Sequence, residues 1–241
     1  LALLYLGFIL WAGLSYFYAI NPTEVIVNIT RQINVLLMFT NMGILFFSIR
    51  NKLIFFPLLV SSILIIEVYY VLVEAIEMIR SYGVISSGSL KGVTANRNIT
   101  AFSLSIKIPF LLFLIYKTKK RVFKILFSIV IFLCLVALSM IQSRASFIAI
   151  GLVTIFFFVL NIYLYLKENK KKEHLLRPLY FIIPITLALF INQIFLSDKG
   201  ADALSRAATI SLNTNDGSVN QRLRYYEDVM THMNSNLIFG V

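Results

Sequence analysis

The sequence has few of the residues from which metal and nucleotide sites are built. It contains one cysteine, Cys134, and two histidines among 241 residues. A single thiol can form neither an intrachain disulfide nor a thiolate metal site. The sequence also contains no Asp-x-Asp, no phosphate-binding P-loop and no dinucleotide-binding fingerprint. These absences favour a function that uses no cofactor, whether a metal or a nucleotide.

Charged residues are also scarce, at 14% of the chain, whereas 59% of the residues are hydrophobic. The hydrophobic residues form long blocks and do not alternate with polar ones. A helix of about 20 apolar residues crosses the roughly 30 Å of bilayer hydrocarbon. We therefore predict an all-α, polytopic membrane protein.

The apolar blocks predict seven transmembrane helices followed by a polar tail. The predicted spans are residues 1–20, 33–49, 53–73, 99–116, 125–141, 147–166 and 179–196. Residues 1–196 would form the membrane region, and residues 197–241 would begin a large extracytoplasmic loop; segments 21–32 and 74–98 are predicted as outer loops. Because the chain begins inside an apolar run and stops at Val241, directly after a glycine, we expect a fragment of a longer protein.

The positive charge of the chain is explained by membrane topology. Lys and Arg number 22 against 11 Asp and Glu, for a net charge of +11. The loops around residues 50–52, 117–124 and 167–177 contain nine Lys and three Arg. Such basic loops face the cytoplasm in membrane proteins, so no nucleic-acid partner is needed to account for the charge.

The rest of the chain contains three Lys and seven Arg, so arginine is the preferred cation outside the cytoplasmic loops. The planar guanidinium binds phosphate through two parallel hydrogen bonds, whereas an ammonium acts as a point charge. The bias therefore favours a phosphate ligand on the outer side, with chance among few residues as the alternative.

Two of these arginines stand where predicted helices enter the membrane from outside: Arg97 in the sequence TANRNIT and Arg144 in QSRAS. Helix N-termini carry unpaired N–H groups and the positive end of the helix dipole, so they favour anions. The alternative for Arg144 is an interfacial arginine that extends to the membrane surface. Glu67 and Lys107, both inside predicted spans, are expected to pair with each other.

The stretch from Ser218 predicts an amphipathic helix, because apolar residues recur there at spacings of four and three. Arg224 has Glu227 and Asp228 three and four residues later, which explains it as one member of a surface ion pair. Arg222 has tyrosines at the equivalent positions. It is therefore the better candidate for binding an anionic ligand.

Several short motifs, taken in order, resemble the O-antigen ligase and O-antigen polymerase family of bacterial membrane glycosyltransferases. They are SYFYAINP at residues 15–22, NRNITAFSL at 96–104, Ser143 with Arg144, and Arg222 upstream of a terminal FGV. The resemblance implies a multi-spanning helix bundle of the GT-C-like type in the bacterial plasma (inner) membrane. Its large extracytoplasmic loop would form a lid over a membrane-embedded donor.

The resemblance also implies the chemistry. A polyprenyl-diphosphate-linked glycan donor would be held by Arg144 and Arg222, with Arg97 as a third diphosphate-binding residue. The glycan would pass with inversion, and without metal, to an acceptor such as lipid A-core. Two departures matter: Leu237 replaces a proline that many relatives carry, and the family's catalytic histidine would lie beyond Val241. His232 is not given that role.

The residues do not separate a ligase, which we favour, from a polymerase, because the two share a donor and differ in the acceptor. A transporter or flippase of a lipid-linked or anionic substrate is the alternative from another class. Transporters commonly show broken helices and repeated halves with charge near the membrane centre, whereas most of the charge here is predicted at the surface. A simple membrane anchor would leave the outer arginines unexplained.

Overall fold

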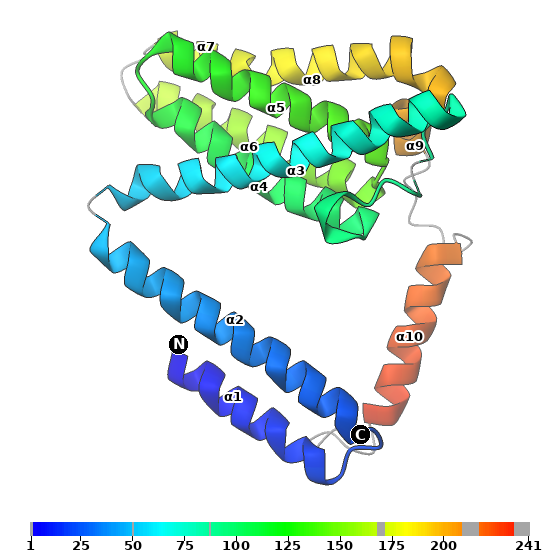
Figure 1. Ribbon diagram of the computed structural model, residues 1–241. Coiled ribbons are helices and arrows are strands. Elements are labelled where there is room, and N and C mark those ends of the chain that lie inside the picture. The colour runs from blue at the N-terminus through cyan, green and yellow to red at the C-terminus, as the bar shows by residue number, and fades with distance from the viewer. Residues whose placement is uncertain (1, 50, 87, 168–171, 209–216, 234–241) are drawn as a thin grey trace. The chain divides into compact units, whose positions relative to one another are not determined.

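The computed structural model describes residues 2–49, 51–86, 88–167, 172–208 and 217–233, and nearly all of them are helical (Figure 1). The α-helices are α1 (Ala2–Leu14), α2 (Pro22–Ser48), α3 (Lys52–Tyr82), α4 (Arg97–Lys117), α5 (Arg121–Ile141), α6 (Arg144–Lys167), α7 (Lys172–Leu176), α8 (Leu179–Ile191), α9 (Ala203–Ala208) and α10 (Gly217–Met233). Shorter turns are η1 (Ser15–Phe17), η2 (Gly92–Thr94), the π-helical η3 (Asn192–Leu196) and η4 (Ser197–Lys199). No strand occurs in these ranges, which confirms the all-α prediction.

Six helical segments are long and apolar enough to cross a membrane, which confirms the polytopic helical class. They are Pro22–Ser48, Leu53–Tyr82, Arg97–Lys117, Arg121–Ile141, Arg144–Lys167 and Lys172–Lys199. Six of the seven predicted spans coincide with these segments. The remaining one, residues 1–20, contains a shorter apolar helix, Leu3–Phe17.

The chain divides into two compact units. Unit 1 comprises Leu1–Lys52 and Ser211–Val241, and unit 2 comprises Leu53–Ile210. In unit 1, α1 folds back along α2 after the turn at η1, and the Tyr5 hydroxyl donates a hydrogen bond to Gln32. Helix α10 also belongs to this unit, and its described side chains are exposed.

Unit 2 is a helix bundle in which α5 is central, packed against both α4 and α8. Ile131, Leu138 and Ile141 of α5 are fully buried. A helix that is apolar on all sides is expected in such a position, because only the interior of a bundle or lipid can receive every face of it. The core of unit 2 is therefore built around α5.

A proline in α8 is compensated by the neighbouring helix. Pro184 has no N–H, so the carbonyl of Tyr180, four residues earlier, loses its intrahelical donor. The Ser128 hydroxyl on α5 donates to this carbonyl at 2.9 Å. An unpaired carbonyl in hydrocarbon would cost several kcal/mol, so this bond stabilises the contact between α5 and α8.

The outer loop predicted for residues 21–32 is wrong, because these residues are helical from Pro22. Asn21 caps α2 by accepting a hydrogen bond from the Glu24 N–H at 3.4 Å. Proline is favoured at the first helical position, where its missing N–H costs nothing. In the second predicted loop, 74–98, helix α3 likewise continues to Tyr82.

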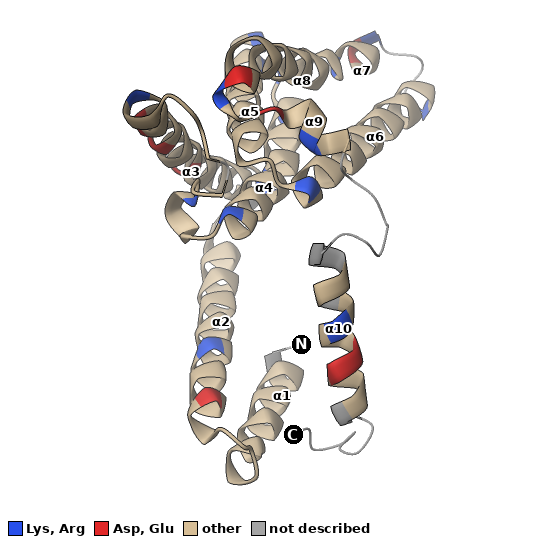
Figure 2. Ribbon diagram, turned by 90° about the vertical axis from the view of Figure 1, so that its right-hand side faces the viewer, with Lys and Arg blue, Asp and Glu red and all other residues tan. Residues whose placement is uncertain are grey.

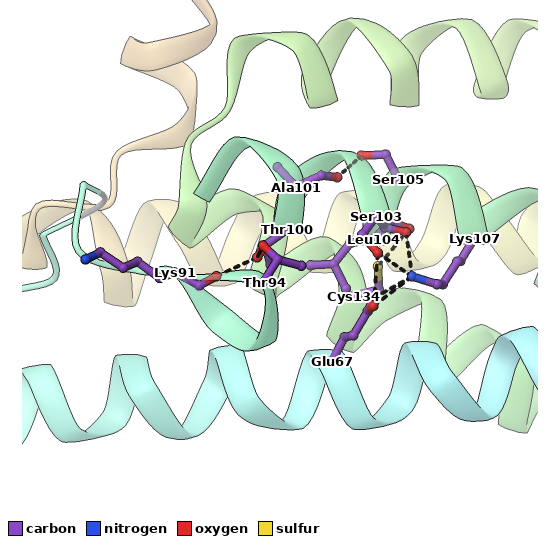
Figure 3. A network of polar contacts seen from close by, with 10 residues as sticks. All are labelled: Glu67, Lys91, Thr94, Thr100, Ala101, Ser103, Leu104, Ser105, Lys107 and Cys134. Carbon is purple, nitrogen blue, oxygen red and sulfur yellow. Dashed lines mark hydrogen bonds and ion pairs between the residues drawn. The ribbon is translucent and has the colours of Figure 1, made fainter. Parts of the chain in front are cut away.

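The predicted ion pair between Glu67 of α3 and Lys107 of α4 is confirmed, with 2.7 Å between Oε2 and Nζ (Figure 3). The two side chains are only 12% and 13% exposed. The Ser103 hydroxyl donates to Oε1 of Glu67 at 2.9 Å. The charges neutralise each other inside the membrane-spanning part of the bundle, which removes most of the cost of burying them.

Candidate functional site

The polar connections of unit 2 lie at its two ends, and two of the predicted site residues lie at one of them (Figure 1). At the end predicted to be cytoplasmic, Lys124 of α5 pairs with Glu173 of α7 at 2.9 Å. There Arg177 also lies over the Tyr116 ring of α4, 4.6 Å from its centre. We call the other end the outer end, defined by residues 83–97, 142–144 and 192–206.

Arg97 is the first residue of α4, and the motif around it sets the start of the helix. The Asn96 side chain accepts hydrogen bonds from the N–H groups of Asn98 at 3.0 Å and Ile99 at 3.4 Å. The Arg97 side chain is half-buried and has no hydrogen-bond or ion-pair partner among the described residues. Its guanidinium is therefore available to an anion at this helix N-terminus.

The segment before Arg97 is held against α3 and α4. The Glu74 carboxylate of α3 accepts hydrogen bonds from the N–H groups of Lys91 at 3.1 Å and Gly92 at 2.9 Å. Gly92 has φ of +55°, and a Cβ there would lie 2.9 Å from Cγ2 of Thr100. The Thr100 hydroxyl donates to the Lys91 carbonyl at 2.5 Å, so the approach to Arg97 is fixed on both sides.

Arg144 begins α6 directly after a tight turn, as the sequence predicts. Gln142 closes α5 in the left-handed conformation, with φ of 56°. The buried Ser143 then accepts hydrogen bonds from the N–H of Ser146 at 3.1 Å and of Phe147 at 3.3 Å. Only two residues separate the helices, so the Arg144 backbone position is set by both α5 and α6.

A buried asparagine joins the segment after α8 to the last turn of α5. Asn192 is fully buried and donates from Nδ2 to the Ser139 hydroxyl of α5 at 3.1 Å and to the Ala201 carbonyl at 2.6 Å. Its Oδ1 accepts the N–H of Ala203 at 2.9 Å. The bonds to Ala201 and Ala203 hold the start of the short helix α9, and the bond to Ser139 joins this segment to α5.

Helix α9 brings Arg206 to the turn that precedes Arg144. The Nε of Arg206 donates to the Gln142 carbonyl at 3.5 Å, and α9 contacts α6. The sequence analysis missed Arg206, although Ser-Arg-Ala at 205–207 repeats Ser-Arg-Ala at 143–145. Near it, hydrogen bonds from the Ser205 hydroxyl and N–H hold the pKa of the Asp202 carboxyl below its usual range.

Backbone contacts join the three segments of the outer end. The Ile85 N–H donates to the Lys199 carbonyl at 2.5 Å, and the Gln142 side chain donates to the Gly200 carbonyl at 3.2 Å. Gly200 has φ of +84°, and a Cβ there would lie 2.9 Å from the Ile85 carbonyl oxygen. Figure 2 shows basic residues on α9 and at the ends of α4 and α6 that belong to the outer end. Arginines clustered at helix N-termini can hold a doubly charged phosphate group.

Helix α10 confirms the predicted helix over residues 218–233, but it does not test the role of Arg222. The side chains of Arg222 and His232 lie outside the described residues, as do Leu237 and the terminal FGV. The ion pair expected for Arg224 with Glu227 or Asp228 does not occur in the described part of α10, where all three residues are exposed. Solvent competes strongly with such surface pairs. Binding by Arg222 stays a prediction.

Comparison with known proteins identifies one family. Residues 129–241, from α5 to the end of the chain, match the family model described as O-antigen ligase. No curated protein and no solved structure matches the chain significantly. The matched segment contains Arg144, Asn192, Arg206 and Arg222, and it confirms the resemblance inferred from the motifs.

Proposed function

We propose, from the match of residues 129–241 to the O-antigen ligase family model, that the protein transfers a glycan from a polyprenyl-diphosphate-linked donor to an acceptor. The transfer takes place at the extracytoplasmic face of the bacterial plasma membrane. The acceptor of a ligase is a lipid-anchored core sugar such as lipid A-core. A polymerase, which adds the glycan to another lipid-linked repeat, is the second candidate within the family.

The observation that carries this proposal is the placement of Arg144. It stands at the start of α6, inside the family-matching segment, and Arg206 of α9 donates a hydrogen bond to the preceding turn. Breaking the glycosidic bond leaves the negative charge on the diphosphate, and that charge grows as the bond lengthens. Positively charged groups held in place beforehand stabilise such developing charge without reorganising.

We assign diphosphate binding to Arg144, Arg97 and Arg222. Arg97 begins α4, which contacts α6, so both helix N-termini belong to the same end of unit 2. The assignment of Arg222, on the predicted lid, follows from the family resemblance. The reaction in this proposal inverts the anomeric centre and uses no metal, since the donor already carries a good leaving group.

Deleting the gene and separating the cell-surface glycans by size tests the proposal. Lipid-linked intermediates are extracted from the same cells, and the wild-type gene restores the phenotype. Loss of all glycan from the acceptor, with polymer accumulating on its lipid carrier, indicates a ligase. A single repeat still attached to the acceptor indicates a polymerase. An unchanged ladder with unchanged intermediates contradicts glycan transfer and favours a transporter.

Arg144→Lys tests the two-point phosphate contact. The variant keeps the positive charge but loses the paired N–H donors, and we expect the transfer rate to fall about tenfold or more. Arg80→Lys is the matched control, because Arg80 is exposed in the last turn of α3 and lies outside the proposed site. Full activity of Arg144→Lys in the complementation assay would rule out this contact.

A further inference from the structure

A groove of about 550 Å³ lies between α5 and α8, at the end of unit 2 opposite the outer end. Its walls are mostly apolar, with Ile125 and Ile129 from α5 and Ile183 and Leu187 from α8. All four of these side chains are exposed in the structure. The groove therefore offers apolar surface to a ligand that approaches from the side of the bundle.

The length of the groove matches one leaflet of a bilayer. On α5 it extends from Arg121, the first residue of the helix, to Phe132. The eleven steps between these residues, at 1.5 Å each, correspond to about 16 Å, which is half of the roughly 30 Å hydrocarbon thickness. An acyl chain of a phospholipid would fit along the groove with its head group at the level of Arg121.

The polar lining of the groove favours an anionic head group. Among the described residues, Arg121 is the one charged residue that lines the groove, and it is exposed and makes no ion pair with any of them. The Ser128 hydroxyl is already bonded to the Tyr180 carbonyl at 2.9 Å. Lys124, one turn after Arg121, is paired with Glu173 and buried, so Arg121 and not Lys124 supplies positive charge to the described lining of the groove.

We propose that this groove is a binding site for an anionic phospholipid of the cytoplasmic leaflet. The acyl chain lies between α5 and α8, and the guanidinium of Arg121 binds the phosphate. The cytoplasmic leaflet is rich in anionic lipids, which basic residues at the membrane surface attract. The inference does not rest on the glycan-transfer proposal, because it uses the opposite end of the bundle and none of the assigned site residues.

The test is a lipid titration of the purified protein in detergent, with bound lipid measured by native mass spectrometry. The probes are phosphatidylglycerol and phosphatidylcholine with identical acyl chains. We expect wild type to prefer phosphatidylglycerol and Arg121→Gln to weaken its binding about fivefold to tenfold, with little effect on phosphatidylcholine. Lys119→Gln is the matched control, since Lys119 is an exposed cation of the same connection outside the groove. It should change binding less than twofold.

A second variant tests the apolar part of the site. Ile129→Trp fills the groove and should weaken both lipids, while size-exclusion profiles identify variants that fail to fold. Arg121→Lys, which keeps the charge, should recover most of the phosphatidylglycerol binding if Arg121→Gln folds poorly.

Equal binding of the two lipids by wild type, or equal losses in Arg121→Gln and Lys119→Gln, would overturn the site. Displacement of phosphatidylglycerol by equimolar polyprenyl phosphate would assign the groove to the donor lipid instead.

Discussion

At the scale of single residues, the clearest prediction about stability concerns Glu67 and Lys107. Each side chain is mostly buried, and each is the other's counter-ion. Removing one partner leaves a charge without compensation in the membrane-spanning part of the bundle. Lys107→Met should therefore destabilise the protein by about 3 kcal/mol or more. Equilibrium unfolding in increasing amounts of sodium dodecyl sulfate measures this loss.

The double substitution Glu67→Leu with Lys107→Met separates charge neutralisation from a more specific role. With both charges gone, most of the lost stability should return. Lys91→Met, which removes an exposed lysine at the outer end, should remain within about 0.5 kcal/mol of wild type. A double variant as unstable as Lys107→Met would show that the pair contributes more than mutual neutralisation.

The ion pair could be predicted from the sequence, whereas Arg206 could not be placed beside Arg144. Glu67 and Lys107 both fall within apolar spans, and an isolated charge in hydrocarbon needs a partner. Arg206 reaches the α5–α6 turn through the buried bonds of Asn192, 53 residues from Ser139 in sequence. No local sequence pattern predicts a contact between residues so far apart. The repeated Ser-Arg-Ala triplet is the one signal in the sequence that links Arg206 to Arg144.

At the scale of elements, Gly200 tests how closely the segment after α8 approaches the α3–α4 connection. Gly200→Ala would place a Cβ 2.9 Å from the Ile85 carbonyl oxygen on a residue with φ of +84°. The left-handed conformation alone costs a residue with a side chain about 1–2 kcal/mol, and the contact with fixed backbone adds to it. We expect a lower midpoint of thermal unfolding together with reduced glycan transfer.

Gly151→Ala is the matched control for Gly200→Ala. Gly151 lies inside α6, where an added Cβ meets no atom within 4 Å. Alanine is a better helix former than glycine by about 1 kcal/mol, so this variant should be neutral or slightly more stable. Equal destabilisation by both substitutions would contradict the close contact at Gly200.

Helix α10 carries the prediction for the lid. Arg222→Ala should lower glycan transfer about a hundredfold or more if its guanidinium stabilises the departing diphosphate. Arg224→Ala, two residues away on the same helix, should stay within about twofold of wild type, because the described Arg224 is exposed and makes no ion pair. Transfer is measured from a purified lipid-linked donor. Equal losses would assign the effect to the helix as a whole and not to Arg222.

The helices of unit 2 were the most predictable elements, and the segments next to them were the least. Long apolar blocks in a membrane leave the backbone no alternative to a helix, so α4, α5 and α6 follow from length alone. The start of α2 depends on the local cap by Asn21 and Pro22, which overrides the polar composition that predicted a loop. Helix α9 is six residues long, too short for a periodic pattern.

At the scale of the whole molecule, the basic loops and the fold of unit 2 together predict which end of the unit 2 bundle faces the cytoplasm. The excess of Lys and Arg predicts that the α4–α5 connection faces the cytoplasm. The hydrogen bond between Ile85 and Lys199 places the α3–α4 connection and the segment after α8 on a common side, which we predict to be extracytoplasmic. The proposed function requires this orientation, because the donor is used there.

Labelling of engineered cysteines with a membrane-impermeant maleimide in spheroplasts tests the orientation of the bundle and the common side of these two segments. The native Cys134 is buried, so background labelling should be low. Ser89→Cys and Lys199→Cys, both exposed at the outer end, should react in intact spheroplasts, whereas Lys119→Cys should react only after permeabilisation. If Ser89→Cys reacts and Lys199→Cys does not, the junction of the two segments is wrong. If only Lys119→Cys reacts, the bundle is inverted, and Arg97 and Arg144 would face the cytoplasm, where extracytoplasmic glycan transfer could not use them.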